Sequence, residues 1–384
     1  ASGESDFSSC PPAAGQNITG QINIGLSVPL SGTQAAYGQL ATGLQAYVST
    51  VNKAGGVNGQ QVKITVLDDQ YDPSKTLTNM QQLVTQDHVA AVAAVSGTPA
   101  NIAISGFMAQ NCVPDVFAAS GDPSLFGKEW VIPGLPNYDL EMAVDIKDVD
   151  KNFPNGAKIA IISSDDDTGK AYLGSIKKAI AGGKDTIVGS QVVESGDVTP
   201  PTAQVTALAG KADVLFSLVH IGNCAGVLTT VSHTDWKPRI YQTQICGNLG
   251  AVMVPAGQAG AGVLISNWIK NFTPQTAASD PSLTPIIQDI KAYSPSTNPA
   301  SLAGAGYIFG QGLIAVLKQA AATGTLSSES IATAAHTLKP VTSAMMLDGV
   351  HIEGSPGNGL VPQLVLLKYD PSTTAWIAQG PATS

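Results

Sequence analysis

The sequence predicts an α/β protein built from two doubly wound lobes, each a parallel sheet covered by helices. Short apolar stretches alternate with amphipathic stretches along most of the chain, which is the pattern of parallel strands joined by helical crossovers. The chain has 384 residues, more than one hydrophobic core usually holds. We therefore expect two sheets, one in each lobe.

The expected strands form two series, with four strand–helix units before residue 137 and four more after residue 157. We expect strands at 22–28, 62–67, 89–95, 114–118, 158–163, 186–193, 214–219, 239–243 and 263–266. The helices between them are expected at 37–54, 74–87, 98–110, 138–153, 168–181, 201–210 and 222–234.

The last part of the chain breaks this alternation. Helical patterns follow one another at 282–293, 301–322 and 328–337, and strand-like stretches return only at 344–352 and 363–369. A chain that crosses between the lobes would explain this order, whereas a plain tandem of two domains is the alternative.

The composition argues against several classes of protein. Hydrophobic residues make up 43% of the chain, but no continuous apolar run approaches the roughly 18 residues of a transmembrane helix. The net charge is −9 and Arg239 is the only arginine, so the clustered cations that nucleic acid requires are missing. Residues 1–20 are rich in Ser, Gly and Pro and lack the basic and apolar regions of a signal peptide. We expect a flexible leader there.

The four cysteines indicate two disulfides rather than a metal site, because none of them forms a CxxC pair. Cys224 and Cys246 are expected at equivalent ends of consecutive strands, which favours a Cys224–Cys246 bond and leaves Cys10–Cys112 as the second. Sequence alone allows three pairings, so this pairing is a preference. Disulfides also favour a location outside the reducing cytoplasm.

The most informative stretch is 22–38, where an apolar strand runs into a Ser-Gly-Thr loop and then a helix. Small ligands bind at the carboxyl ends of strands in open α/β sheets, where helix N-termini offer free N–H groups. The turn Ala54-Gly55-Gly56-Val57-Asn58-Gly59 and a further strand follow. Together these segments resemble the opening of the leucine/isoleucine/valine-binding family of periplasmic solute receptors, which feed ABC importers.

The resemblance extends over residues 20–370 and implies the type I periplasmic binding fold, with two lobes joined by a three-strand hinge. It places 21–136 and 268–342 in the N-terminal lobe, and 137–267 and 343–384 in the C-terminal lobe. Leaders of this family often attach the protein to a membrane through a lipidated cysteine, so lipid anchoring stays open here.

In the first lobe, three loops resemble the ligand-binding loops of the family. Two of them follow the third and fourth strands and would hold a ligand carboxylate with hydroxyl and amide groups; a capped helix is the alternative for the first of these two. Tyr37 either contacts the ligand or packs the first helix. The residues expected to bind ligand are Ser31, Tyr37, Ser96, Gly97, Thr98, Asn101, Ala119, Ser120 and Gly121.

In the second lobe, Asp165-Asp166-Asp167-Thr168-Gly169 follows a strand and resembles a family loop that carries an aromatic ligand contact. Thr168 stands where the tyrosine is expected, and Asp167 is a candidate partner for a cationic ligand group. A solvated helix start is the alternative for this acidic run. Calcium binding of the EF-hand type is not expected, because the required loop glycine and glutamate are missing.

Two further loops depart from the amino-acid-binding pattern of the family. His220 and Asn223 stand in the loop where an aromatic residue is expected, and Gln244 stands where an acid would pair the ligand ammonium. Burying a poorly paired ammonium is costly. The sequence therefore favours a small carboxylate or amide, including aromatic ones, over a branched-chain amino acid.

The sequence contains no complete match to the enzyme motifs below. Residues 121–128 nearly match a phosphate-binding loop, but the glycine spacing is one residue too long and Glu129 replaces the required Ser or Thr. The sequence also lacks G-x-S-x-G and H-E-x-x-H. We expect a non-catalytic, monomeric extracytoplasmic receptor without cofactor or metal, whose partners are a small ligand and an ABC permease. A ligand-sensing domain for signalling and a cryptic hydrolase remain as alternatives.

Overall fold

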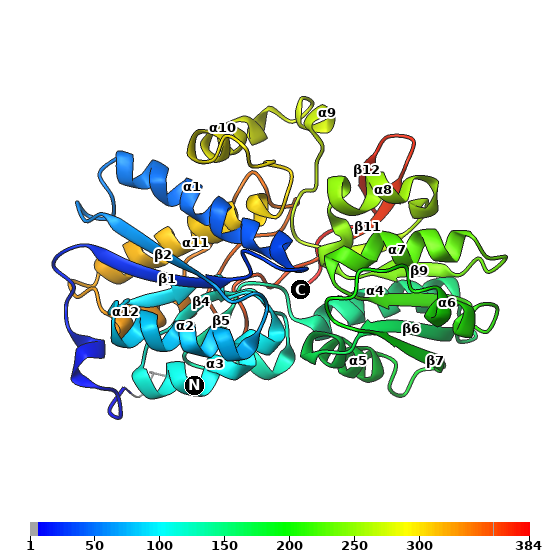
Figure 1. Ribbon diagram of the computed structural model, residues 1–384, viewed down its shortest axis with the longest axis horizontal. Coiled ribbons are helices and arrows are strands. Elements are labelled where there is room, and N and C mark those ends of the chain that lie inside the picture. The colour runs from blue at the N-terminus through cyan, green and yellow to red at the C-terminus, as the bar shows by residue number, and fades with distance from the viewer. Residues whose placement is uncertain (1–6, 356) are drawn as a thin grey trace. The chain divides into compact units, whose positions relative to one another are not determined.

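The computed structural model describes residues 7–355 and 357–384 and contains two sheets, each in its own compact unit (Figure 1). This confirms the predicted α/β class with two parallel-sheet lobes. Unit 1 comprises the described residues of Ala1–Asn137, Ser282–Met346 and His351–Pro362, and unit 2 comprises Tyr138–Pro281, Leu347–Val350 and Gln363–Ser384.

These units differ from the expected lobes in two places: the segment 268–281 belongs to unit 2, whereas residues 343–346 and 351–362 belong to unit 1. Trp268 accepts a hydrogen bond from the N–H of Leu347 at 3.1 Å, and Lys270 pairs with Asp280 at 2.9 Å. These contacts are made inside unit 2, which is why the change of unit falls at Pro281.

Unit 1 is built around a five-stranded parallel sheet with the strand order β2-β1-β3-β4-β5. Its strands are β1 (Ile22–Val28), β2 (Val62–Asp68), β3 (Ala91–Ala93), β4 (Asp115–Ala118) and β5 (Val131–Pro133). Its helices are α1 (Gln39–Lys53), α2 (Pro73–Thr85), α3 (Thr98–Asn111), α10 (Thr284–Tyr293), α11 (Ala303–Ala321) and α12 (Ser328–His336). The sequence did not predict β5, which has only three residues.

Helices α1 and α11 cover one face of this sheet, and α2 and α3 cover the other (Figure 1). Two glycines allow α1 and α11 to pack closely. A Cβ atom on Gly43 would lie 1.8 Å from the Ala303 carbonyl oxygen, and one on Gly306 would lie 2.0 Å from the Leu40 carbonyl oxygen. Any larger side chain would force the two helices apart.

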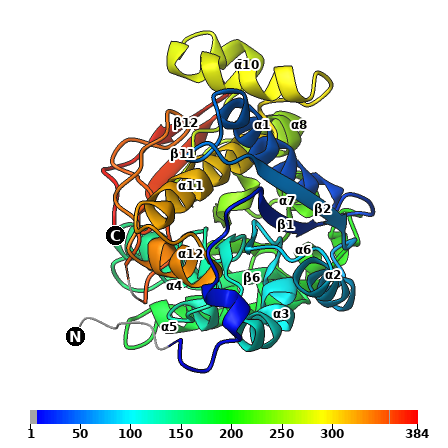
Figure 2. The same cartoon turned by 90° about the vertical axis from the view of Figure 1, so that its left-hand side faces the viewer.

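Residues 7–20 are bound to unit 1, which corrects the expectation of a flexible leader for this segment. The Cys10–Cys112 disulfide joins it to the end of α3. The N–H of Ile18 donates to the Leu326 carbonyl at 2.7 Å, and the segment runs beside α12 (Figure 2). The first part of the expected leader lies outside the described residues.

Unit 2 contains a seven-stranded mixed sheet with the order β12-β11-β10-β9-β8-β6-β7, in which only the pairs involving β11 and β12 are antiparallel. Its strands are β6 (Lys158–Ser164), β7 (Thr186–Val193), β8 (Val214–Leu218), β9 (Arg239–Gln242), β10 (Leu264–Asn267), β11 (Val365–Asp370) and β12 (Ala375–Ala378). Its α-helices are α4 (Tyr138–Asn152), α5 (Asp167–Ala179), α6 (Thr202–Leu208), α7 (Ile221–Ser232), α8 (Val254–Ala256) and α9 (Pro274–Ala277), and the short turn η4 (Gln244–Gly247) follows β9.

The end of the chain shows where pattern reading was wrong. The expected strand at 344–352 is absent, because only Met346 and Ile352 in it form isolated bridges, that of Ile352 to Val341. The expected strand at 363–369 corresponds to β11, and β12 was not predicted. Within the described residues, no helix combines the length and apolar character that crossing a membrane requires.

Candidate functional site

The carboxyl ends of the parallel strands bring the predicted loops together within each unit. In unit 1, Ser96 pairs with Ala119 through a β-bridge, and the N–H of Gly97 donates to the Ala119 carbonyl at 3.2 Å. The loops after β3 and β4 are therefore neighbours, as parallel pairing requires.

A pair of small hydroxyls lies in these two loops. Thr98 Oγ1 and Ser120 Oγ are 2.8 Å apart, and both residues are buried. Thr98 is also the first residue of α3, whose N-terminal N–H groups have no partner within the helix. Hydroxyls beside a helix N-terminus can donate to a carboxylate or a carbonyl without a cationic side chain.

Asn101 and Ser31 have structural partners inside unit 1. The Asn101 side chain donates to the carbonyls of Val95 and Gly97 at 2.9 and 2.8 Å, which holds the loop before α3. Ser31 Oγ donates to Asp68 Oδ2 at 2.6 Å. The Ser31 hydroxyl and the Asn101 side-chain amide therefore stabilise loops within unit 1. A ligand role for these two residues stays a prediction.

Tyr37 is accompanied by a second tyrosine that the sequence did not single out. The rings of Tyr37 and Tyr71 stack with centroids 5.7 Å apart. The Tyr71 ring also covers Gly97, where a Cβ atom would lie 2.6 Å from it. The only signal in the sequence was an aromatic residue three positions after β2, a spacing that is common in loops.

Gln34 is a further residue that sequence reading missed. It is 3% exposed, and neither its amide oxygen nor its amide nitrogen has a hydrogen-bond partner. A buried amide without partners is costly and needs an explanation. Its place between the Ser-Gly-Thr loop and Tyr37 makes it a candidate ligand contact in unit 1.

The strongest polar contact at the carboxyl ends of the unit 2 strands joins Asp166 to His220. Asp166 Oδ2 lies 2.6 Å from His220 Nε2. The same carboxylate accepts hydrogen bonds from Ser164 Oγ at 2.8 Å, Ser195 Oγ at 3.2 Å and the N–H of Gly169 at 3.2 Å. Burial alone would raise the pKa of Asp166, but the hydrogen bond and charge of His220 and the other donors lower it to about 2.

The acid that matters structurally in this loop is thus Asp166, not Asp167. Asp166 caps α5, whereas Asp167 begins the helix and pairs with Lys170 at 3.3 Å on the surface. Thr168 is half-buried in the first helical turn. The sequence did not reveal which of three consecutive aspartates would be the N-cap.

Asn223 and Gln244 lie at the ends of neighbouring strands in unit 2. The Asn223 amide donates to the Asp197 carbonyl at 2.5 Å and fastens the loop after β7. Gln244 begins η4 directly after β9. Its N–H and its Nε2 donate to the two oxygens of Glu141, at 2.8 and 2.9 Å.

Glu141 is a buried acid that the sequence analysis did not consider. Besides Gln244, Tyr172 Oη donates to it at 2.9 Å. Burial raises the pKa of Glu141 to about 7, although the hydrogen bonds from Gln244 and Tyr172 favour its ionised form. One turn further along α4, Asp145 is buried with Ser266 as donor, and burial together with Glu141 raises its pKa well above the usual value.

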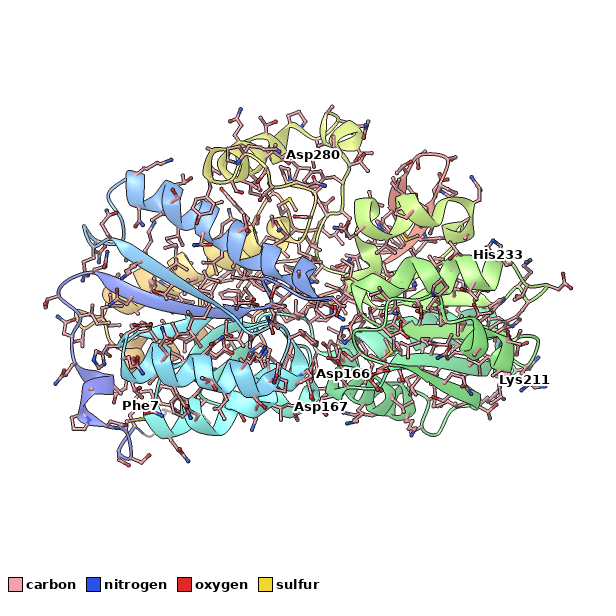
Figure 3. The ribbon with its side chains drawn as sticks, viewed as in Figure 1. Phe7, Asp166, Asp167, Lys211, His233 and Asp280 are labelled. Carbon is pink, nitrogen blue, oxygen red and sulfur yellow. A yellow bond between two sulfur atoms is a disulfide. The ribbon has the colours of Figure 1, made fainter. Side chains whose placement is uncertain are left out.

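The Cys224–Cys246 disulfide is present, as preferred from the sequence, and links α7 to η4. Figure 3 shows Asp166 and Asp167 at one end of unit 2, while Lys211 and His233 lie at the opposite end. Among residues 7–355 and 357–384, no group of three or more His, Cys, Asp or Glu side chains is placed to hold a metal ion.

The fold and these loop-end polar groups define a protein of the periplasmic binding class. Residues 21–360 match the family described as periplasmic binding protein. The chain belongs to this family, whose members are binding proteins and not enzymes.

Curated relatives are similar over different lengths. Leu/Ile/Val-binding protein BraC3 of Rhizobium johnstonii is 29% identical over 198 residues, which cover 51% of this chain and 53% of that protein. Leu/Ile/Val-binding protein homolog 3 of Brucella melitensis is 27% identical over 362 residues, or 91% of each chain. The aligned region thus spans about half of the first relative and most of the second.

Solved structures share the fold at low identity. A branched chain amino acid ABC transporter protein from Thermus thermophilus with bound valine has a TM-score of 0.83 at 17% identity, covering 95% of this chain and 97% of that one. A fatty acid ABC transporter substrate-binding protein from Thermomonospora curvata has 0.82 at 20% identity, covering 96% and 94%. A solute binding protein from R. palustris in complex with benzoate has 0.76 at 17% identity, covering 95% and 98%.

Proposed function

We propose that this protein is an extracytoplasmic solute-binding protein that captures a small carboxylate or amide and delivers it to an ABC importer. Family membership and the named relatives support a receptor of this kind. Proteins of the same fold are named for valine, fatty acid and benzoate, so the fold alone leaves the ligand open.

The observation that carries the choice of ligand is the state of the buried acids in unit 2. Asp166 accepts from four donors, including His220. Glu141 accepts from the backbone and side chain of Gln244 and from Tyr172. An α-ammonium group needs a carboxylate that is still open for pairing, and burying it without one is costly. This favours a ligand without an ammonium group.

Unit 1 offers groups that suit a ligand carboxylate. Thr98, Ser120 and the N-terminus of α3 supply neutral donors for a carboxylate or a carbonyl. The single arginine is not available for this purpose, because Arg239 begins β9 and pairs with Asp148 at 2.5 Å. The carboxylate would thus be held by neutral dipoles in place of a guanidinium group.

In this proposal, the ligand is captured before the protein meets the permease. The predicted ligand residues Thr98 and Ser120 belong to unit 1, and His220 and Gln244 belong to unit 2. The lipid anchor, the monomeric state and the permease contact remain parts of the proposal.

Thermal unfolding with matched ligands tests it. The protein is unfolded and refolded to remove any bound compound, and valine is compared with 3-methylbutanoate, 2-hydroxy-3-methylbutanoate and benzoate, each near millimolar. A micromolar ligand at about 1,000-fold excess adds about 4 kcal/mol of stability and raises Tm by several degrees.

We expect a shift from at least one acid that lacks the ammonium group and none from valine. A shift from valine alone would overturn the ligand assignment. No shift from any of the four compounds would count against the receptor function itself.

A further inference from the structure

We propose that Glu141 is a positioning residue that fixes the amide of Gln244, so that Gln244 Oε1 is the acceptor for an uncharged O–H or N–H group of the ligand. This inference rests on the proposed function for the ligand, whereas the Glu141–Gln244 arrangement itself can be tested without one.

The chemistry of the contact determines which way the amide of Gln244 faces. Glu141 Oε1 accepts the N–H of Gln244 at 2.8 Å, and Glu141 Oε2 accepts Gln244 Nε2 at 2.9 Å. An ionised carboxylate has no hydrogen to donate, so only the NH₂ side of the amide can face it. The amide oxygen is therefore turned away from Glu141.

That amide oxygen is buried and has no hydrogen-bond donor. Gln244 is 7% exposed, and its Oε1 has no hydrogen-bond partner. A buried carbonyl oxygen without a donor is unfavourable. Gln244 follows β9 at the carboxyl end of the sheet, where α/β proteins bind ligands. A ligand donor would satisfy this oxygen.

The donor on the ligand is expected to be neutral. The charge of Glu141 is shared by three donors, two from Gln244 and one from Tyr172. Asp166 is paired with His220, and burial raises the pKa of Asp145 well above its usual value, which favours the neutral acid. We therefore assign a small carboxylate that also carries a hydroxyl or an amide N–H.

The contact between Glu141 and Gln244 also makes the group that Gln244 presents to a ligand depend on pH. Glu141 contributes to the raised pKa of Asp145 on α4, Tyr172 faces Glu141 from α5, and the ring of Tyr138 stacks on Tyr172 at 3.7 Å. Arg239 forms an ion pair with Asp148, which lies further along α4. The pKa of Glu141 is about 7.

A protonated Glu141 has an O–H that needs an acceptor, so one of its three donors must change role. Tyr172 can rotate its hydroxyl, whereas Gln244 can flip its amide and offer Oε1 to Glu141. This flip of the Gln244 amide would turn its NH₂ group away from Glu141. Gln244 would then present a hydrogen-bond donor to the ligand in place of the acceptor Oε1.

Nuclear magnetic resonance of the ligand-free protein tests the arrangement. The Gln244 side-chain amide is identified in a ¹⁵N-labelled sample by comparison with Gln244→Leu and by backbone-based assignment of the unmodified protein. We expect one of its protons to exchange slowly and the signal to move with a midpoint near pH 7. This pH response should be lost in Glu141→Gln and kept in Glu194→Gln, since Glu194 is exposed.

An amide of Gln244 that does not change between pH 5.5 and 8.5 would overturn the positioning role of Glu141. The titration of the unmodified protein decides this even if Glu141→Gln does not fold.

Calorimetry with two matched pairs tests the ligand class. We compare 2-hydroxy-3-methylbutanoate with 3-methylbutanoate, and 4-hydroxybenzoate with benzoate, at pH 8. The hydroxyl should improve Kd by roughly tenfold, as one satisfied hydrogen bond can, and Gln244→Leu should remove that preference.

A hydroxyl preference that persists in Gln244→Leu would overturn the assignment of Oε1 as the acceptor. Binding of none of the four acids would overturn the ligand class and the proposed function, while the resonance measurement would still decide the role of Glu141.

Discussion

Asp166 Oδ2 and His220 Nε2 lie 2.6 Å apart and connect the ends of two neighbouring strands, β6 and β8, in unit 2. Both side chains are largely buried, with 13% and 3% of their surfaces exposed. The pair occupies a position where the family resemblance led us to expect an aromatic ligand contact. The contact therefore changes the character of the site as well as stabilising the loop.

Replacing Asp166 by Asn should lower stability by about 2 kcal/mol at pH 7. The pKa of Asp166 is lowered from 3.8 to about 2, and each unit corresponds to about 1.4 kcal/mol. The contribution is present above pH 3.8 and is lost as the pH falls towards 2, so the difference between the proteins should shrink in acid. Urea unfolding at pH 7 and pH 2.5 measures it.

Asp167→Asn is the matched control, since Asp167 is 42% exposed on its side chain and pairs only at the surface. Equal losses in the two variants would contradict the distinction between these neighbouring acids.

Replacing Glu141 by Gln should flatten the dependence of stability on pH. The pKa of Glu141 is raised from 4.5 to about 7, so the folded state binds the proton more tightly than the unfolded state. Its contribution is fully present below pH 4.5 and is lost as the pH rises through 7, which amounts to about 3 kcal/mol. Unfolding in urea at pH 5 and pH 8 should show this loss in the unmodified protein and much less in Glu141→Gln.

Glu194→Gln should keep the full pH dependence, because Glu194 is exposed. An identical pH profile in Glu141→Gln and the unmodified protein would show that Glu141 is not the titrating group.

Removing the Cys224–Cys246 disulfide by a double change to Ser should cost about 3 kcal/mol. The two cysteines are 22 residues apart, and closing a loop of that length restricts the unfolded chain by about this amount. The midpoint of urea unfolding gives the result, and a reducing agent should destabilise the unmodified protein in the same direction. Insensitivity of the unfolding midpoint to both treatments would argue against this bond.

Gly97→Ala should destabilise unit 1 by about 2 kcal/mol. Gly97 has φ of 103°, which suits glycine, and an added Cβ would lie 2.6 Å from the Tyr71 ring. Gly106→Ala in the middle of α3 is the control, because a Cβ there meets no atom within 4 Å. Gly106→Ala should be more stable than the unmodified protein by about 0.5 to 1 kcal/mol. A similar loss of stability in both variants would contradict the strain at Gly97.

The parts of the fold that depend on local pattern were predictable. The strand at 22–28 matches β1 residue by residue, since apolar β-branched residues end there at a Pro-Leu-Ser-Gly turn. The prediction of a strand at 344–352 was wrong because its apolar residues pack without pairing as a strand, apart from isolated bridges at Met346 and Ile352. An edge strand as short as β12, with four residues, is too short to be recognised from its pattern.

The candidate site was predictable to the level of its loops. Parallel strands place their carboxyl ends at one edge, so the loops with Thr98, Ser120, His220 and Gln244 could be identified. The partners within those loops could not. Tyr71 stacks on Tyr37 from another loop, and Gln34 is buried without a partner, and neither fact has a local signal.

The sequence by itself determined the α/β class, the loops at the strand ends and the absence of an acid at Gln244, because these depend on residue type and spacing along the chain. The tertiary structure alone decided which acids are engaged. Glu141 and Gln244 are 103 residues apart. Asp166 caps the helix and contacts His220, whereas its neighbour Asp167 pairs with Lys170 at the surface. Burial and hydrogen bonding act between residues that folding brings together, and these interactions determine which groups remain open to a ligand.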